Sequence, residues 1–254
     1  MSNQPAKSLI SFDNVNKSYS GKSAVKNLTF SIAENEFVGL IGNNGCGKTT
    51  TINILCNLTP YESGRASILG SRITPGYSSY KKNLGIVLST HYSIDTFSVT
   101  DYLSFVGEFQ SLKKKQIKER IEDLLVLLEL QNESRKAIKD LSSGNKMKVS
   151  LAAALIHNPR ILILDEPFVN LDIKSTQTIS EILKSFKGKK TVLITSHNLD
   201  LVVELCDRFL LMETGTIIAQ VENHTGLTSE ELKQQIKSHL STNPGILKEI
   251  TWLN

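Results

Sequence analysis

Cysteine is scarce in this sequence of 254 residues. Its three cysteines are an odd number that cannot close into a complete set of disulfides, which favours a reducing compartment. Long hydrophobic runs are missing too: runs such as residues 124–128 and 161–164 fall far short of the roughly 18 apolar residues that span a bilayer. The first residues carry no apolar core followed by a small-residue cleavage site, so we expect no secretion signal. If the protein works at a membrane, we expect another chain to carry the membrane-spanning part.

Charge of one sign is not in marked excess either. The 29 Lys and Arg residues against 25 Asp and Glu give a formal net charge of +4, too weak an imbalance to indicate nucleic acid as a partner. The basic run Lys113-Lys114-Lys115 would need a broader basic surface to bind nucleic acid, so we interpret it as the exposed start of a helix. With 40% hydrophobic and 21% charged residues, the composition is that of an ordinary globular protein. We therefore expect no nucleic-acid partner.

Short apolar runs predict an α/β fold. Strand-like runs, bounded by Asn, Gly, Lys and Ser, lie at residues 9–15, 28–32, 37–41, 66–69, 84–88, 161–164, 191–195 and 209–212. The runs at 161–164 and 191–195 are fully apolar, as in parallel strands that are covered on both faces. Helical patterns alternate with the strands at residues 48–58, 175–186 and 199–206. This alternation predicts a wound parallel sheet.

One helical stretch breaks the alternation. From residue 99 to 130 apolar side chains recur at spacings of three and four, which predicts almost uninterrupted helix. We therefore predict a helical subdomain at residues 91–156, inserted into an α/β core made of residues 1–90 and 157–221. The remaining residues, 222–254, are polar apart from one amphipathic helix, and we regard them as a C-terminal extension of the same single domain.

The strongest motif is a glycine-rich loop at residues 42–49, which we call the phosphate loop. It follows an apolar run, precedes a predicted helix and fits the pattern Gly-x4-Gly-Lys-Ser/Thr. In such loops backbone N–H groups wrap phosphate oxygens, Lys48 reaches the β and γ phosphates, and the Thr49 hydroxyl ligates Mg²⁺. The positive end of the following helix faces the same anion. The predicted ATP-phosphate site comprises Gly42, Asn43, Asn44, Gly45, Cys46, Gly47, Lys48, Thr49 and Thr50.

Cys46 stands out inside this loop. A thiol near a helix N-terminus and Lys48 is expected to have a lowered pKa and some reactivity. The alternative is that a small residue merely fits there.

A second motif places two acids after an apolar strand. The run at 161–164 is followed by Asp165 and Glu166, so their carboxylates should lie at the carboxyl edge of the sheet, where open α/β folds bind ligands. Asp165 is then placed to hold Mg²⁺, commonly through water. Glu166 is suited to polarise an attacking water as a base. Acids at strand ends often serve only as structural caps. Because this sequence also has a phosphate loop, we favour the catalytic interpretation.

Four further motifs, in order and spacing, resemble the ATP-binding cassette (ABC) family from about residue 9 to 220. Leu141-Ser142-Ser143-Gly144-Asn145 is similar to the family's signature Leu-Ser-Gly-Gly-Gln, and Asn170-Leu171-Asp172 is similar to its D-loop. His197 resembles the switch histidine that contacts the γ-phosphate, although it could instead cap the following helix. Tyr19 resembles the aromatic residue that stacks on adenine, although it could be an ordinary buried aromatic.

The resemblance implies a RecA-like P-loop core with an N-terminal antiparallel β layer and an inserted helical subdomain. It implies an ATPase that uses ATP and Mg²⁺, with Lys48, Glu166 and His197 as its catalytic residues. Two copies, or one copy and a homologous ATPase subunit, would sandwich the nucleotides, each signature acting in trans on the other subunit's ATP. The dimer would power a separate membrane permease, and the protein would be cytoplasmic and peripheral on the inner face of the cell membrane.

Two departures from the family pattern affect these expectations. Ser143 replaces the first signature glycine and Asn145 replaces the glutamine, while Ser142 and Gly144, which make the closest contacts, are retained. At the Q-loop, Ser89 stands where the family has the glutamine that meets the metal. A serine hydroxyl falls short of a glutamine carboxamide by about 2.5 Å, so we expect a water in place of that ligand.

Other proteins with a phosphate loop differ from a transporter ATPase in the partner they work with or in the nucleotide they bind. The run at 146–155 resembles the exporter branch with small two-gene permeases more than the nutrient importers. A soluble, non-transport ABC ATPase is the alternative function; such proteins usually carry two cassettes or a long coiled-coil insertion, which this sequence lacks. A GTPase would need an Asn-Lys-x-Asp guanine reader, and none is present.

Overall fold

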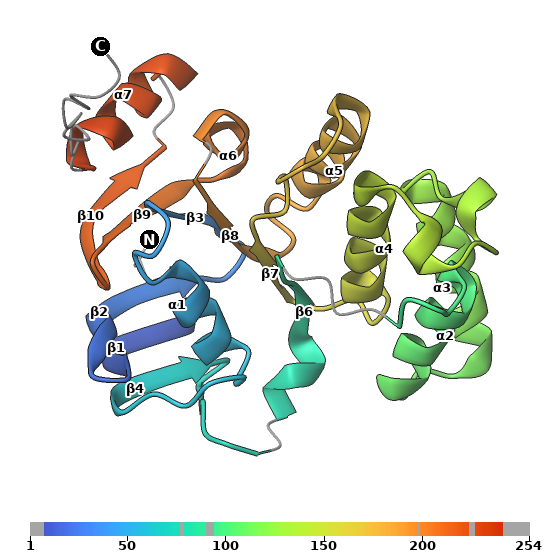
Figure 1. Cartoon of the computed structure of the whole chain (residues 1–254), viewed down its shortest axis with the longest axis horizontal. Helices are drawn as coiled ribbons and strands as arrows, with labels where there is room; N and C mark the ends of the chain where they lie inside the picture. The colour runs from blue at the N-terminus through green and yellow to red at the C-terminus, as the bar shows by residue number, and fades with distance from the viewer. Residues whose placement is uncertain (1–7, 77–78, 90–93, 198, 224–226, 241–254) are drawn as a thin grey trace, which may run out of the picture.

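A computed structural model describes residues 8–76, 79–89, 94–197, 199–223 and 227–240. Within them the chain forms two β-sheets with helices between and around them (Figure 1). Among these residues no helix is long and apolar enough to cross a membrane.

The N-terminal sheet is antiparallel and has the strand order β2-β1-β4-β5. Its strands are β1 (Ser8–Tyr19), β2 (Lys22–Ala33), β4 (Ser63–Ile68) and β5 (Ser71–Arg72). Alternate apolar side chains of β1 and β2 point to one face, where Phe12 and Phe30 stack with ring centroids 4.8 Å apart. The expected antiparallel layer is therefore confirmed.

The main sheet has the strand order β10-β9-β3-β8-β7-β6. Its strands are β3 (Phe37–Ile41), β6 (Leu84–Val87), β7 (Ile161–Asp165), β8 (Thr191–Ser196), β9 (Arg208–Glu213) and β10 (Thr216–Glu222). All pairs are parallel except β9 and β10. Every residue of β3, β7 and β8 is buried, as their apolar sequences predict. The carboxyl ends of β3, β7 and β8 consequently meet at one edge of the sheet.

Helices cover both faces of the main sheet. Helix α1 (Lys48–Leu55) shares an apolar core with the antiparallel sheet and one face of the main sheet. Helices α5 (Ile173–Ser185), α6 (Leu199–Leu205) and α7 (Ser229–His239) belong to the core on the other face. Short 3-10 turns lie at Ser79–Asn83, Gln131–Glu133 and Ile138–Asp140. The RecA-like α/β architecture follows from this layering.

Three more helices lie together at the end of the molecule away from the antiparallel sheet (Figure 1). They are α2 (Val99–Phe109), α3 (Lys114–Leu127) and α4 (Ser143–Leu155). The expectation of nearly continuous helix over 99–130 is wrong at Ser111, whose φ of 61° is left-handed and breaks the helix between α2 and α3. Lys114 and Lys115 are exposed in the first turn of α3, which confirms the interpretation of the basic run.

Candidate active site

The phosphate loop connects β3 to α1 at the carboxyl edge of the main sheet. The side chain of Lys48 is only 7% exposed, and its Nζ donates to the carbonyl oxygens of Gly42 at 2.7 Å and Asn43 at 3.4 Å. Thr49 is exposed, whereas Thr50 is half-buried. The side chain of Lys48 therefore folds back onto the backbone of its own loop.

Two glycines of the loop are required by space or backbone conformation. Gly47 has a φ of 114°, and a Cβ there would come within 2.5 Å of the Ala24 carbonyl oxygen. A Cβ on Gly42 would lie 2.2 Å from the Met212 carbonyl oxygen. Since Ala24 belongs to β2 and Met212 to β9, the loop is wedged between the two sheets, which fixes its shape.

Cys46 does not have the reactive thiol that the sequence suggested. Its side chain is buried within the loop, and burial raises the pKa of the thiol above its ordinary value, although Lys48 acts in the opposite direction. The predicted lowering of the Cys46 pKa is therefore wrong, because desolvation outweighs the nearby positive charge. A small residue that fits the loop is the better interpretation.

Asp165 is the most enclosed acid at this edge, with a side chain 2% exposed. Its Oδ1 accepts a hydrogen bond from the Thr195 hydroxyl at 2.6 Å, and its Oδ2 accepts one from the Ser89 hydroxyl at 2.8 Å. The carboxylate is thus held by one hydroxyl from each side. Sequence reasoning missed Thr195, although a hydroxyl residue at the end of a buried apolar strand is a signal for such a role.

Glu166 follows at the turn after β7. Its backbone is left-handed, with φ at 51°, and its N–H is directed at the carbonyl and hydroxyl oxygens of Thr195, at 3.2 and 3.0 Å. Its side chain is 15% exposed and meets two predicted site residues: Oε1 lies 3.8 Å from Lys48 Nζ, and Oε2 lies 3.0 Å from His197 Nδ1. The structure thereby brings Lys48, Glu166 and His197 together, as a catalytic group would require.

The donor chemistry at this edge fits magnesium. Mg²⁺ prefers oxygen ligands and is commonly held by one or two protein groups together with phosphates and water. Thr49, an exposed residue, has a hydroxyl oxygen, and Asp165 has a carboxylate, and both are oxygen donors of this kind. Helix α1, which carries Thr49, packs against β7, which carries Asp165.

The signature segment opens α4. Ser142 is the N-cap residue, and its hydroxyl accepts a hydrogen bond from the Asn145 N–H at 3.2 Å. The Ser143 hydroxyl donates to the Asn170 carbonyl oxygen at 2.8 Å, which ties the signature to the D-loop. This contact explains how serine is accommodated where the family has glycine.

Gly144 and the D-loop are packed closely together. A Cβ on Gly144 would lie 2.3 Å from Ser175 Oγ and 2.7 Å from Asp172 Oδ2. Asp172 is the N-cap of α5: it accepts hydrogen bonds from the N–H of Ser175 at 2.8 Å and from its hydroxyl at 2.7 Å, and both lower the pKa of the carboxyl. Leu171 packs partly buried against the core. Sequence reasoning missed Ser175, which links the signature to the D-loop.

A cleft of about 430 Å³ lies between the residues of the phosphate site and those of the signature and the D-loop. Its lining includes Asn44, Ser89, Ser143, Glu166, Asn170 and His197. The phosphate loop, Glu166 and the signature thus border one continuous space.

Tyr19 lies apart from these residues, at the end of β1. It is 45% exposed, with Lys17 Nζ 5.1 Å from its ring centroid, so the alternative of a buried aromatic is wrong. The neighbouring β2 reaches the phosphate loop at Ala24. The ring is therefore accessible on the strand pair that borders the loop.

Comparisons with known proteins identify the family of this chain. The profile of the family described as "ABC transporter" matches residues 25–169, more than half of the chain. The linearmycin resistance ATP-binding protein LnrL of Bacillus subtilis (strain 168) is 34% identical over 212 residues, covering 83% of this chain and 68% of that protein. The Nod factor export ATP-binding protein I of Rhizobium leguminosarum bv. viciae is 35% identical with the same coverage of each chain.

Among solved structures, the fold is similar to that of the ATP-binding cassette MJ0796 in a dimeric post-hydrolysis state bound to ADP and Pi. The TM-score is 0.78 at 24% identity, with 85% of this chain and 99% of that chain covered. This likeness supports the fold assigned from the strand order.

Proposed function

Because this chain belongs to the ABC transporter family, and is thus an ATPase that works on ATP and Mg²⁺, we propose that it powers transport through a separate membrane permease. The convergence of Lys48, Glu166 and His197 next to Asp165 would supply the centre for ATP hydrolysis that such transport requires. The family match to ABC transporters is the observation that carries the proposal of a permease. The protein would act peripherally on the cytoplasmic face of the cell membrane, held there by the permease.

Each residue at the edge has a role in phosphoryl transfer. Lys48 and the backbone N–H groups of the phosphate loop bind the phosphates, and Thr49 and Asp165 hold the magnesium ion. When bound, the ion neutralises charge on the phosphate oxygens. Glu166 orients and polarises the attacking water, and His197 stabilises the charge that develops as the bond to the γ-phosphate breaks.

The sites are completed by a second subunit, either another copy or a homologous ATPase. The N-terminus of α4, with Ser142 and Gly144, offers an anion site that would face the partner's ATP. Two exposed apolar side chains flank the D-loop: Val169, 40% exposed, precedes it, and Ile173, 79% exposed, is the first residue of α5. Such residues fit an interface that closes around nucleotide and reopens after hydrolysis.

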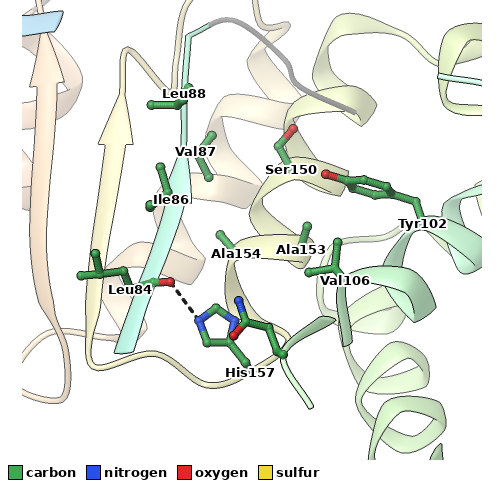
Figure 2. Close-up of a pocket in the computed structure, with 11 residues that line it drawn as sticks. Leu84, Ile86, Val87, Leu88, Tyr102, Val106, Ser150, Ala153, Ala154 and His157 are labelled. Atoms are coloured by element: carbon green, nitrogen blue, oxygen red, sulfur yellow. Dashed lines mark hydrogen bonds between the residues drawn. The ribbon is translucent and has the colours of Figure 1, made fainter. Parts of the chain in front are cut away.

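We further propose that residues 91–156 act as the helical subdomain that meets the permease. A groove of about 290 Å³ runs between β6, the last strand of the sheet, and the helices α2 and α4 (Figure 2). Val87 of β6 points toward α4, Tyr102 and Val106 lie on the α2 side, and Ala153 and Ala154 of α4 lie between them (Figure 2). This apolar lining suits a short amphipathic segment of the permease.

Two exposed aromatic residues stand beside this groove on α2. Phe105 is 47% and Phe109 79% exposed, one helical position before Val106 and Gln110, which line the groove. Large apolar side chains left in solvent commonly mark a contact surface.

Export is the proposed direction of transport, supported by the named export and resistance functions of the two relatives.

The test is co-purification with a candidate permease, a multi-span membrane protein sought among the genes that neighbour this one. We expect a stable complex, and we expect its ATP turnover to rise when the two proteins are reconstituted in lipid vesicles. The double variant Phe105→Ser, Phe109→Ser should no longer form this complex. If the double variant no longer copurifies with the permease but keeps its basal ATP turnover, the exposed face of α2 is the surface that contacts the permease. Full ATP turnover with no membrane partner captured would favour the soluble, non-transport ATPase.

A further inference from the structure

The two oxygens of the Asp165 carboxylate are held by hydroxyls from opposite neighbours. Thr195 Oγ1 donates to Oδ1 at 2.6 Å, and Ser89 Oγ donates to Oδ2 at 2.8 Å. Hydrogen bonds to a charged acceptor are stronger than neutral ones, so both contacts restrict rotation of the carboxylate. Asp165 itself is almost fully buried.

The strand register explains why both hydroxyls reach Asp165. In the parallel pairing of β7 with β8, Asp165 lies opposite Thr195. In the pairing of β6 with β7, Val87 lies opposite Leu164, so the chain leaving β6 brings residues 88 and 89 beside Asp165 and Glu166. Ser89 therefore reaches the carboxylate from the edge-strand side, while Thr195 reaches it from the centre of the sheet.

We propose that Ser89 is a positioning residue for the Asp165 carboxylate, a role that rests on the proposed function of Asp165 in holding magnesium. Its hydroxyl is too short to replace a glutamine ligand, and in the structure it binds the carboxylate. The loop after β6 would thus act on magnesium through Asp165. When a group that hydrogen-bonds to a metal ligand is removed, metal affinity commonly falls by about 10- to 100-fold.

The test compares Ser89→Ala with Ser89→Thr, which keeps the hydroxyl. Ser185→Ala is the matched control, because that hydroxyl donates to a carbonyl of its own helix, α5. The measurements use the full chain and a fluorescent ATP analogue: analogue affinity without magnesium, then the magnesium concentration that half-saturates the analogue-bound protein. Circular dichroism checks that each variant is folded.

For Ser89→Ala we expect magnesium binding to weaken by about 10-fold or more, with analogue affinity in the absence of magnesium unchanged. Ser89→Thr should restore magnesium affinity, and Ser185→Ala should match wild type. Wild-type magnesium affinity in folded Ser89→Ala, or tighter binding because a competing donor is gone, would overturn the proposal. If wild type itself fails to bind the analogue, the proposed function is refuted instead.

Discussion

Glu166 and His197 are joined by a hydrogen-bonded contact of 3.0 Å between Oε2 and Nδ1. The other oxygen of the same carboxylate lies 3.8 Å from Lys48 Nζ. One side chain therefore bridges the phosphate loop after β3 and the end of β8, which are separated by more than a hundred residues of sequence. The left-handed backbone at Glu166 turns the chain so that this bridge can form.

The signature is predicted to act on the partner's nucleotide. In Ser142→Arg the arginine would fill the anion site at the N-terminus of α4, so hydrolysis should fall to background while the monomer still binds ATP. Mixing Ser142→Arg with Lys48→Ala should restore one competent site in each mixed dimer. The measurement is ATP turnover against mixing ratio, with nucleotide affinity determined on each monomer.

Ser142→Ala controls for the lost helix cap, whose removal destabilises by about 1 kcal/mol. It should hydrolyse ATP better than Ser142→Arg at equal helix stability. If Ser142→Arg alone loses monomer affinity for ATP, the signature acts within its own chain and the trans arrangement is wrong.

The exposed ring of Tyr19 is predicted to stack on the adenine base. Stacking on an aromatic side chain contributes about 1–3 kcal/mol per base, so Tyr19→Ala should weaken ATP binding by roughly 5- to 150-fold. Tyr19→Phe keeps the ring and should bind like wild type. The readout is equilibrium binding of ATP, with inorganic triphosphate as a ligand that lacks the base; equal losses for both ligands would argue against stacking.

Cys46 is predicted to alkylate slowly at neutral pH. Thiolate is the reactive form, and a raised pKa moves the midpoint of thiolate formation to higher pH, so the fraction of thiolate at pH 7–8 is smaller than for a free thiol with a pKa near 8.5. Iodoacetamide labelling followed by peptide mass spectrometry from pH 7 to pH 10 gives the midpoint. Cys56, whose pKa burial raises to about 12, is an internal comparison that should react more slowly still. A Cys46 midpoint below that of free cysteine would restore the reactive-thiol interpretation.

Gly144→Ala is predicted to destabilise the junction of α4 and α5. Its Cβ would displace Ser175 Oγ and Asp172 Oδ2, which together form the N-cap of α5. Overpacking and loss of a cap each destabilise by about 1–2 kcal/mol. Urea unfolding measures the effect, with Ser143→Ala as a control that removes one hydrogen bond without adding volume. An unfolding midpoint for Gly144→Ala equal to wild type would show that the junction relaxes freely.

Much of the core could be predicted because its signal is local. The strands β3, β7 and β8 are short, fully apolar runs, and the phosphate loop and the acid pair are contiguous motifs attached to them. The strand β10 was missed because its apolar run, residues 217–219, is only three residues long and only Val221 is buried; the strand forms by pairing with β9.

The contacts of the site could be predicted less well, because they depend on register and packing. Ser89 meets Asp165 only through the alignment of β6 with β7, and Ser175 meets Gly144 only through the approach of α5 to α4. The pKa of Cys46 was misjudged for a related reason: sequence shows the nearby Lys48, but burial is a property of the folded loop. Side-chain contacts between segments far apart in sequence require the structure.

The central claim is that Glu166 activates water for ATP hydrolysis, and Glu166→Gln tests it most directly. Glutamine keeps the size and most hydrogen bonding but removes the basicity, so single-turnover hydrolysis should fall by about 10²- to 10⁴-fold while ATP affinity is retained. Size-exclusion chromatography with ATP should show an accumulated dimer that wild type does not retain. Hydrolysis at the wild-type rate by folded, ATP-bound Glu166→Gln would contradict the account.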